Sequence, residues 1–152
     1  MCIAKRLEEL GITLPEPPAP VAAYVPVVQS GNLAFVSGQG PVVGGKPAFV
    51  GRLGAEFDVT QGQQAARLAV INCIAQLNAY LGSLDRVRRI VKVLGFVACT
   101  DDFDQQPFVI NGASELLEQV FGQNGRHARS AVGTNKLPFN IPVEVELIAE
   151  VE

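Results

Sequence analysis

Apolar and acidic residues alternate along positions 143–151, the last run of the chain. One parity is apolar throughout, and it consists of Val143, Val145, Leu147, Ala149 and Val151. The other parity holds Glu144, Glu146 and Glu150 and is broken only by Ile148. A period of two is expected of a strand with one buried face. The pattern therefore predicts a terminal strand whose acidic side points away from the core.

A second strand is predicted shortly before this run, at Ala128–Val132, where small and β-branched residues follow one another. Positions 133–140 supply Gly, Asn and Pro for the connection between the two segments. Arg129 and Glu144 lie on these segments, fifteen positions apart. We therefore expect a strand pair or near-pair that carries one permanent cation and one carboxylate.

The chain begins with a predicted short amphipathic helix, because apolar residues recur at helical spacing at Ile3, Leu7 and Leu10. Five prolines fall between positions 11 and 26, so this segment is expected to be an extended connector. We thus describe residues 1–26 as an N-terminal helix followed by a proline-rich connector.

A hairpin is predicted after the connector. Turn-forming residues at positions 29–32 separate two apolar runs, Val25–Val28 and Leu33–Val36. A third strand is expected at Pro47–Val50, after the pair Gly44-Gly45. Sheet structure thus begins before the first long helix.

The first long helix is predicted from a capping box and an apolar stripe. Thr60 and Gln63 have the spacing at which a hydroxyl accepts from the backbone amide three residues on while the Gln side chain reaches back. Apolar positions then recur at three- and four-residue steps, at Ala66, Val70, Cys73, Ile74, Leu77 and Leu81. Gly82 supplies a left-handed stop.

A central strand and a second long helix follow. Arg88–Cys99 is rich in Val, Ile and Phe, which predicts a strand inside the sheet. Asp104 is expected to cap the next helix, with Pro107 in its first turn and Gly122 at its end. Its buried side is predicted to be Val109, Ile110, Ala113, Leu116, Leu117, Val120 and Phe121.

This order of elements predicts an α+β fold in which one sheet carries both long helices on one face. The 152 residues, 48% of them hydrophobic, are sufficient for one domain, and we expect residues 1–152 to form it. The other sheet face would then carry apolar residues such as Ile148 and part of Arg88–Cys99. Because burial of apolar surface is favourable by roughly 25 cal/mol per Å², we expect copies of the chain to associate.

Composition narrows the function classes. A formal net charge of −3 provides no attraction to phosphate backbones, so a nucleic-acid partner is not expected. No apolar run is long enough to span a bilayer, and the acidic start does not resemble a signal peptide, which predicts a cytoplasmic protein without a membrane partner. Cys2, Cys73 and Cys99 have no metal-binding spacing, and with His127 as the single histidine no metal site is expected.

The pair Arg129 and Glu144 has two interpretations. A row of glutamates on an exposed strand face is commonly solvated surface, and an arginine nearby commonly balances its charge. The guanidinium of Arg129 also offers a planar fork that binds a carboxylate through two parallel hydrogen bonds. Residue types alone leave both interpretations open.

Three segments resemble a known family. Arg129-Ser130, Leu137-Pro138 and the run from Val143 to Glu146 with Ala149 are similar to the C-terminal signature of the Rid (YjgF) family, and positions 31–39 resemble its N-terminal hairpin. These proteins are reactive-intermediate deaminases, also described as L-PSP endoribonucleases. The resemblance implies a chorismate-mutase-like sheet, a homotrimer, a site at the subunit interface, and hydrolysis of 2-imino or enamine acids to 2-keto acids without a cofactor.

The resemblance also implies roles for particular residues. Arg129 matches the arginine that holds the substrate carboxylate, and Glu144 the glutamate that positions water. Tyr24 matches a pocket tyrosine. Ser37-Gly38 would present a backbone amide, and Asn111 resembles an asparagine of the second helix. Each of the last three has an ordinary alternative: an aromatic cover for Tyr24, a turn at Ser37-Gly38, and a different placement for Asn111.

Two positions depart from the family pattern. Ala131 stands where the deaminases often have cysteine, and His127 where proline is common. A histidine facing the pocket would add a group that titrates near neutral pH, whereas a lone histidine beside an arginine is commonly on the surface. Three hypotheses follow: an imine deaminase, a non-catalytic small-carboxylate binding or regulatory protein with the same pocket, and an endoribonuclease.

Overall fold

The structure, a computed structural model, describes residues 2–20 and 22–152. Met1 and position 21 of the expected N-terminal segment lie outside the described residues. Along the chain the α-helices and strands are α1 (Ile3–Glu9), β1 (Val27–Ser30), β2 (Leu33–Gln39), β3 (Val42–Val43), β4 (Lys46–Pro47), α2 (Val59–Leu81), β5 (Val87–Ala98), α3 (Gln106–Phe121), β6 (Ala128–Thr134) and β7 (Val143–Val151). Short 3₁₀ turns occupy Leu84–Arg86, Gly122–Gly125 and Pro138–Asn140.

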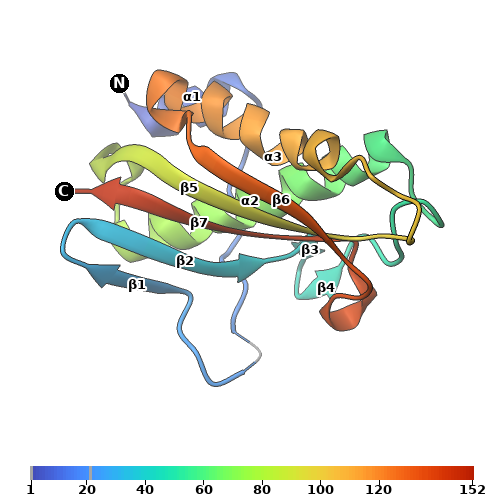
Figure 1. Cartoon of the computed structure of the whole chain (residues 1–152). Helices are drawn as coiled ribbons and strands as arrows, with labels where there is room; N and C mark the ends of the chain where they lie inside the picture. Colours follow the sequence, from blue (N-terminus) through green and yellow to red (C-terminus); the bar gives the residue numbers. More distant parts are fainter. Residues whose placement is uncertain (1, 21) are drawn as a thin grey trace.

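Five strands form one mixed sheet in the order β1-β2-β7-β5-β6. Strand β6 is parallel to β5, and the other neighbours are antiparallel. The long helices α2 and α3 lie side by side on one face of this sheet (Figure 1). The predicted α+β fold with two helices on one sheet face is therefore confirmed.

The hydrophobic periodicity fits the layers. In β7 the apolar parity is buried from Val143 to Val151, and the parity of Glu144 is only partly buried. The predicted stripes of α2 and α3 are buried as well. Strand β5 has neighbours on both sides, as its apolar composition predicted. One continuous core thus fills the space between the helices and the sheet.

The first long helix begins two residues before the predicted capping box. Asp58 is the N-cap: its carboxylate accepts from the backbone amide of Gln61, and the Gln61 side chain accepts from the amide of Asp58. A carboxylate is favoured at a helix N-terminus, where the helix dipole is positive. Gln63 is used elsewhere, since its Nε2 donates to the carbonyl of Phe108 in α3. The predicted box at Thr60 was wrong for these two reasons.

The predicted cap of the second long helix was also wrong. Gln105, not Asp104, is the N-cap of α3, and it makes no capping hydrogen bond with its side chain. The side-chain amide of Gln106 donates instead to the carbonyl of Phe103, which closes the turn before the helix. Pro107 lies in the first turn, as expected, because its missing N–H needs no partner there.

The region around Gly44-Gly45 differs from the prediction of a strand at Pro47–Val50. Strands β3 and β4 form a small separate hairpin, and both glycines in its turn have positive φ, 58° and 81°. Such a turn folds the chain back after two residues, so it pairs 42–43 with 46–47. The chain is no longer paired with β3 after Pro47, and Val50 is exposed.

Strand β1 begins at Val27, two residues later than expected.

The face of the main sheet opposite the helices is covered at the end of β5, where Leu137 and Ile141 pack with Ala98 and Phe96, and it carries exposed apolar side chains on β2 and β6. Phe35 of β2 is paired with Ile148 of β7, Glu144 with Phe96 of β5, and Phe96 in turn with Val132 of β6. All these residues lie on the parity opposite to the core, and Phe35 and Val132 are 41% and 43% exposed. We call this surface the open face. Its apolar character agrees with the sequence prediction.

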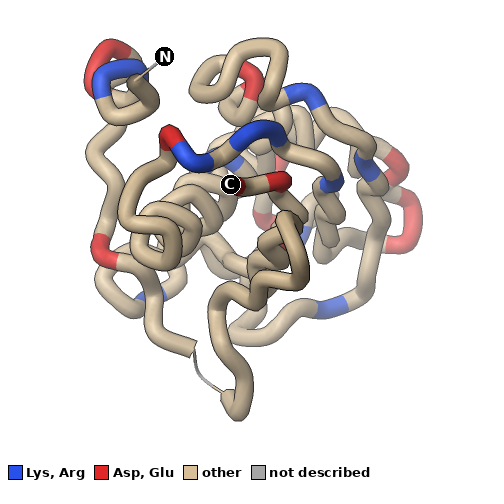
Figure 2. Tube along the Cα trace, turned by 90° about the vertical axis from the view of Figure 1, so that its left-hand side faces the viewer, with Lys and Arg blue, Asp and Glu red and all other residues tan. Residues whose placement is uncertain are grey.

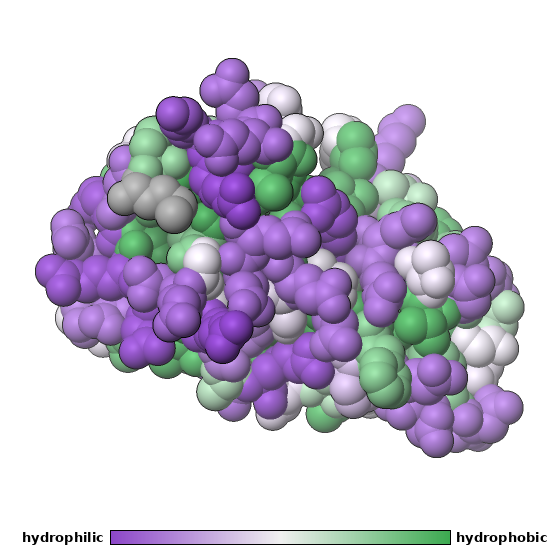
Figure 3. All heavy atoms as spheres, turned by 90° about the horizontal axis from the view of Figure 1, so that it is seen from above, coloured by the Kyte–Doolittle hydropathy of each residue, from purple (hydrophilic) through white to green (hydrophobic). Residues whose placement is uncertain are grey.

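Charged residues of both signs are found on other parts of the surface, and the start of β5 meets the C-terminus, where Arg88 pairs with Glu152 at 3.3 Å (Figure 2). The surface seen from the side of α1, α3 and β6 is mostly hydrophilic, with small hydrophobic patches (Figure 3). No helix in the described part of the chain has the length and hydropathy to cross a membrane.

Candidate functional site

Arg129 lies on the edge strand β6 and points toward the helices. It is paired with Val93 of β5, a core residue, and in a parallel pair such partners share a face. Its Nη1 donates to Asn111 Oδ1 at 2.9 Å and to Ser114 Oγ at 3.2 Å. Asn111 and Ser114 are one turn apart on α3, so the helix holds one end of the guanidinium. Asn111 thus lies beside Arg129, and its predicted role in substrate binding stays a prediction.

The two hydrogen bonds leave the other side of the guanidinium free. Both protons of Nη1 are used, whereas Nε and Nη2 of Arg129 have no hydrogen-bond partner in the ranges 2–20 and 22–152. These two nitrogens form the side-on fork that binds a carboxylate through parallel hydrogen bonds. Partial burial lowers the pKa of Arg129, yet a guanidinium keeps its charge at neutral pH. The geometry is that of an anchored, charged receptor for a carboxylate.

His127 is connected to Arg129 through Ser114. Its Nε2 lies 2.9 Å from Ser114 Oγ, and its Nδ1 lies 2.7 Å from the carbonyl oxygen of Gly125. A carbonyl only accepts, so Nδ1 carries the proton and Nε2 accepts from the serine hydroxyl. Burial is the main cause that lowers the pKa of His127, and the charge of Arg129 adds to it. The neutral ring is therefore part of a polar chain behind Arg129.

Ser114 was not among the residues predicted from the sequence. A serine inside an amphipathic helix is common and has no special pattern of its own. Its position three residues after Asn111 places both side chains on one helix face, and this spacing is the signal that could have identified it.

Glu144 lies on the open face. It alternates with the core residues Val143 and Val145 and is paired with Phe96. Burial, and to a smaller extent the negative charge of Glu146, raises the pKa of Glu144. A carboxylate that is harder to ionise is a stronger base, which suits proton transfer near neutral pH. Glu146 has the same parity on β7.

Gly38 lies against Glu144. A Cβ atom at position 38 would be 2.7 Å from Glu144 Oε2, so any larger residue would displace this carboxylate from its present position. Between the pairs of Val36 and Gln39 with β7, two residues of β2 stand opposite Glu146, which is a β-bulge. Bulges redirect side chains and backbone groups next to binding sites.

Ser37 cannot present its backbone amide to a ligand in this structure. Its N–H donates to the carbonyl of Pro26 at 2.8 Å, and its hydroxyl donates to the carbonyl of Val25. The amide of Ser37 holds the chain before β1, and the predicted role of the pair Ser37-Gly38 in substrate binding stays a prediction. Gly38 remains the candidate of the pair.

Tyr24 is exposed and lies just before β1. Strand β1 is one edge of the sheet and β6 is the other, so three strands separate Tyr24 from Arg129 in sheet order (Figure 1). The tyrosine does not meet Arg129 within one chain. Its predicted role in a pocket stays a prediction.

Arg129 and Glu144 do not form one site within a single chain. Strand β5 lies between β6 and β7, and strands are spaced by about 4.8 Å, so the two backbones are roughly 10 Å apart. The side chains also leave the sheet on opposite faces, Arg129 toward α3 and Glu144 on the open face. The expected near-pair of strands is present, but its two charged residues face apart. We call the two groups the arginine half-site, made of Arg129, Asn111, Ser114 and His127, and the glutamate half-site, made of Glu144 and Gly38.

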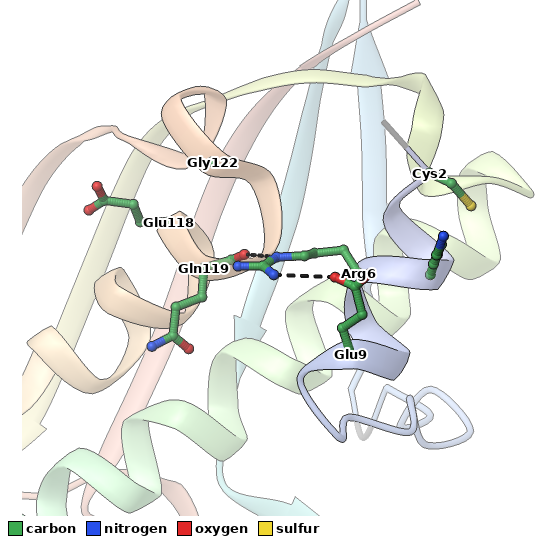
Figure 4. Close-up of a pocket in the computed structure, with 7 residues that line it drawn as sticks. Cys2, Arg6, Glu9, Glu118, Gln119 and Gly122 are labelled. Atoms are coloured by element: carbon green, nitrogen blue, oxygen red, sulfur yellow. Dashed lines mark hydrogen bonds and ion pairs between the residues drawn. The ribbon is translucent and has the colours of Figure 1, made fainter.

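The surface also contains a pocket between α1 and α3, which Glu118 lines (Figure 4). Arg6 crosses it: Nε donates to the carbonyl of Gln119 at 2.8 Å, and Nη1 pairs with Glu9 at 3.4 Å. Arg6 is thus engaged by Gln119 and Glu9, and its bond to Gln119 joins α1 to α3. No group of His, Cys, Asp and Glu side chains suited to a metal ion occurs among the described residues.

The fold and the two half-sites define a class: small α+β proteins with a mixed sheet, two helices on one face, and an edge-strand arginine anchored by a helix. Residues 4–151 match the model of the YjgF/chorismate mutase-like endoribonuclease family. The chain therefore belongs to this family, as its signature segments predicted.

Relatives of known sequence agree with this assignment. Protein TCP17 of Trypanosoma cruzi is 48% identical over 151 residues, which cover 97% of this chain and 93% of TCP17. A 2-iminobutanoate/2-iminopropanoate deaminase of Dermatophagoides farinae is 31% identical over 143 residues, covering 93% and 95% of the two chains.

Solved structures agree as well. The Agrobacterium tumefaciens protein Atu1372, of unknown function, has a TM-score of 0.92 and 49% identity, with 99% of this chain and 92% of that chain covered. A candidate endoribonuclease from Shewanella oneidensis has a TM-score of 0.96 and 36% identity over 99% of this chain and 100% of that chain. These similarities establish the family and the fold.

Proposed function

We propose that the protein hydrolyses reactive 2-imino acids and their enamine tautomers to 2-keto acids and ammonia. The observation that carries this proposal is the arginine half-site, where Nη1 is fixed by α3 and the Nε/Nη2 fork of Arg129 is free. A 2-imino acid offers the carboxylate that such a fork binds. The similarity to a deaminase at 31% identity supports the same substrate class.

The two half-sites have complementary chemistry for this reaction. Arg129 holds the carboxylate and so places the adjacent imine carbon. Glu144, whose pKa is raised by burial, takes a proton from water as the water oxygen attacks that carbon. That proton passes from Glu144 to the imine nitrogen, so the carbon then bears a hydroxyl and an amino group. The ionised Glu144 next takes the hydroxyl proton and delivers it to the amino nitrogen, and the C–N bond breaks as the keto group forms, which releases ammonia without a cofactor.

The active site in this proposal is composed of two subunits. Since Arg129 and Glu144 face opposite sides of the sheet, one subunit supplies the arginine half-site and another the glutamate half-site. The open face, with its exposed apolar Phe35 and Val132, provides a reason to associate, because burial of apolar surface favours contact. The homotrimer that the family resemblance implies is the expected assembly.

A mixing experiment tests this arrangement. Arg129→Ala and Glu144→Gln subunits are each expected to be inactive toward 2-aminoacrylate or 2-iminobutanoate generated by a coupled dehydratase. When the two variants are co-refolded in equal amounts, about one quarter of composite sites contain both native residues, which should restore about a quarter of the native rate. If the site lay within one chain, the mixture would be as inactive as its components.

A second function is favoured by one observation. The arginine half-site is complete within a chain, while Ala131 stands where the deaminases often have cysteine, which fits a protein that binds small carboxylates without turnover. Calorimetry with 2-oxobutanoate separates the two functions: saturable binding that Arg129→Ala abolishes, together with no acceleration of imine hydrolysis, would identify a binding protein.

RNA cleavage is not favoured by a net charge of −3. RNA cleavage that persists in the Arg129→Ala variant would indicate a contaminating nuclease.

A further inference from the structure

The segment that joins α3 to β6 is fastened to α3 at three successive residues. Gly125 packs so closely on the carbonyl of Leu117 that a Cβ atom would collide with it. Arg126 pairs with Glu118 at 2.8 Å. His127 then meets Ser114 at 2.9 Å. These three contacts fix the position of the chain relative to α3 up to His127, which lies two residues before Arg129 and directly before β6.

The hydrogen bonds that link Gly125, His127, Ser114 and Arg129 can be satisfied together by only one assignment of donors and acceptors. The Gly125 carbonyl can only accept, so His127 donates from Nδ1. Nε2 is then an acceptor, and the Ser114 hydroxyl donates to it. The lone pairs of Ser114 Oγ are left to accept from Arg129 Nη1 at 3.2 Å. If the hydrogen bonds ran in the opposite direction, a partly buried donor or acceptor would lose its partner, which is unfavourable.

We infer that Ser114 and His127 are positioning residues for Arg129: the neutral His127 ring orients the Ser114 hydroxyl so that its oxygen faces Nη1, and this keeps the Nε/Nη2 fork aimed at a carboxylate. The inference rests on the proposed function in one respect, that the ligand of the fork is a carboxylate. It assigns a role to the histidine that replaces the proline common in the family.

Protonation of His127 would break this chain. A protonated ring donates from both nitrogens, so the Ser114 hydroxyl could no longer donate to Nε2, and a second positive charge would stand beside Arg129. Several charged groups surround the ring: Arg129 on β6, Glu118 on α3, and Arg89, Arg126 and Glu150 at the surface pocket that His127 lines. Burial lowers the pKa of His127, and Arg129 adds to this against the opposing effects of the Gly125 carbonyl and Glu118, so the neutral form prevails at neutral pH.

The first experiment needs no activity. His127 is the only histidine in the chain, so the ¹⁵N NMR signals of its ring need no assignment in protein prepared without a histidine tag. We expect Nδ1 to be protonated and Nε2 unprotonated near neutral pH, and Ser114→Ala to change the Nε2 shift while Ser114→Thr preserves it. The opposite tautomer, or a freely exchanging ring, would overturn the inference even in a fully active protein.

The second experiment measures carboxylate binding. Ser114→Ala is expected to weaken the binding of 2-oxobutanoate and raise KM by about fivefold with little change in kcat, because the anchor acts equally on substrate and transition state. Ser114→Thr, which keeps the hydroxyl, should stay close to the native values. Equal affinities of all three proteins would contradict the inference, and circular dichroism checks that each is folded.

The pH dependence of 2-oxobutanoate affinity shows whether His127 acts by positioning Arg129 or by its own positive charge. Native affinity for 2-oxobutanoate should fall as pH drops through the pKa of His127, whereas His127→Gln, which can accept from Ser114 and does not titrate, should not show this fall. If affinity instead rises as His127 gains its proton, the histidine acts as an attractive charge and the inference is wrong. A protein that shows the predicted tautomer but binds no keto acid would refute the proposed function alone.

Discussion

The arginine half-site and the glutamate half-site differ in how much of their environment one chain supplies. Arg129 has hydrogen bonds to Asn111 and Ser114 and a histidine behind them. The side chain of Glu144 has no hydrogen-bond partner among residues 2–20 and 22–152, and its surroundings are the open face and the bare backbone of Gly38. The first half-site is organised by the fold of one chain.

This difference indicates which half-site would gain contacts when subunits associate. A carboxylate that is half-buried without partners is costly unless another group compensates for it. Arg129 of the arginine half-site lies on the edge strand β6, whose outer backbone N–H and C=O groups are free to pair with a neighbouring chain. An assembly would complete the glutamate half-site and leave the arginine half-site unchanged. The predictions below test this contrast.

The largest effect is expected for Glu144→Gln. The amide cannot take a proton from water, so kcat for imine hydrolysis should fall by about 100-fold or more, while calorimetry should still detect 2-oxobutanoate binding at Arg129. Glu150→Gln, on the same strand and parity, is the matched control and should keep its rate. Loss of ligand binding in Glu144→Gln would mean that the two half-sites are not separate in function.

Arg129→Lys is expected to have the next largest effect. Lysine keeps the charge but not the planar fork or the two bonds to α3, so kcat/KM should fall by about 100-fold, mainly through KM. The measurement is steady-state kinetics with imine from a coupled dehydratase. Arg88→Lys, at an exposed ion pair, serves as control. A near-native Arg129→Lys enzyme would show that only the charge matters.

Phe35→Asp tests the open face. A charge placed in an apolar contact should separate the subunits, and the rate at low protein concentration should fall by about 10-fold while the isolated chain remains folded. Analytical ultracentrifugation and circular dichroism measure the two properties. Phe139→Asp changes an exposed phenylalanine outside the sheet and should leave both unchanged. A fully active Phe35→Asp monomer would refute the composite site.

The smallest effect concerns Glu146. Its negative charge contributes to the raised pKa of Glu144, so Glu146→Gln should lower that pKa. Glu144 acts as a base in its ionised form, and activity is lost as pH falls through its pKa. The acidic limb of the kcat/KM profile should therefore move to lower pH in Glu146→Gln and stay in place in Glu150→Gln. An unchanged limb would indicate that another group controls it.

Much of the fold could be predicted from local patterns. The alternation in 143–151, the stripes of the two long helices and the glycine stop at Gly82 each depend on residues near one another in sequence, and each is present in the structure. Predictions failed where two local solutions competed, as for the cap at Asp58 against Thr60. The choice there depended on Gln63 being needed by α3, which is a contact between distant segments.

The candidate site was only partly predictable for the same reason. Arg129, Glu144, Gly38 and Asn111 were identified by type and by resemblance, but Ser114 acquires its role only because α3 lies beside β6. Nothing in the spacing of Arg129 and Glu144 reveals that their side chains face apart. That result follows from the register of β6 on β5 and of β5 on β7.

The sequence by itself determined the elements, the parity of each strand and the residue types available for chemistry, because periodicity and propensity act over a few neighbouring positions. Only the tertiary structure decided that β5 separates β6 from β7, that a helix anchors Arg129, and that Glu144 stands on the open face. These are properties of long-range strand pairing and helix packing, in which the lowest free energy depends on all the segments together.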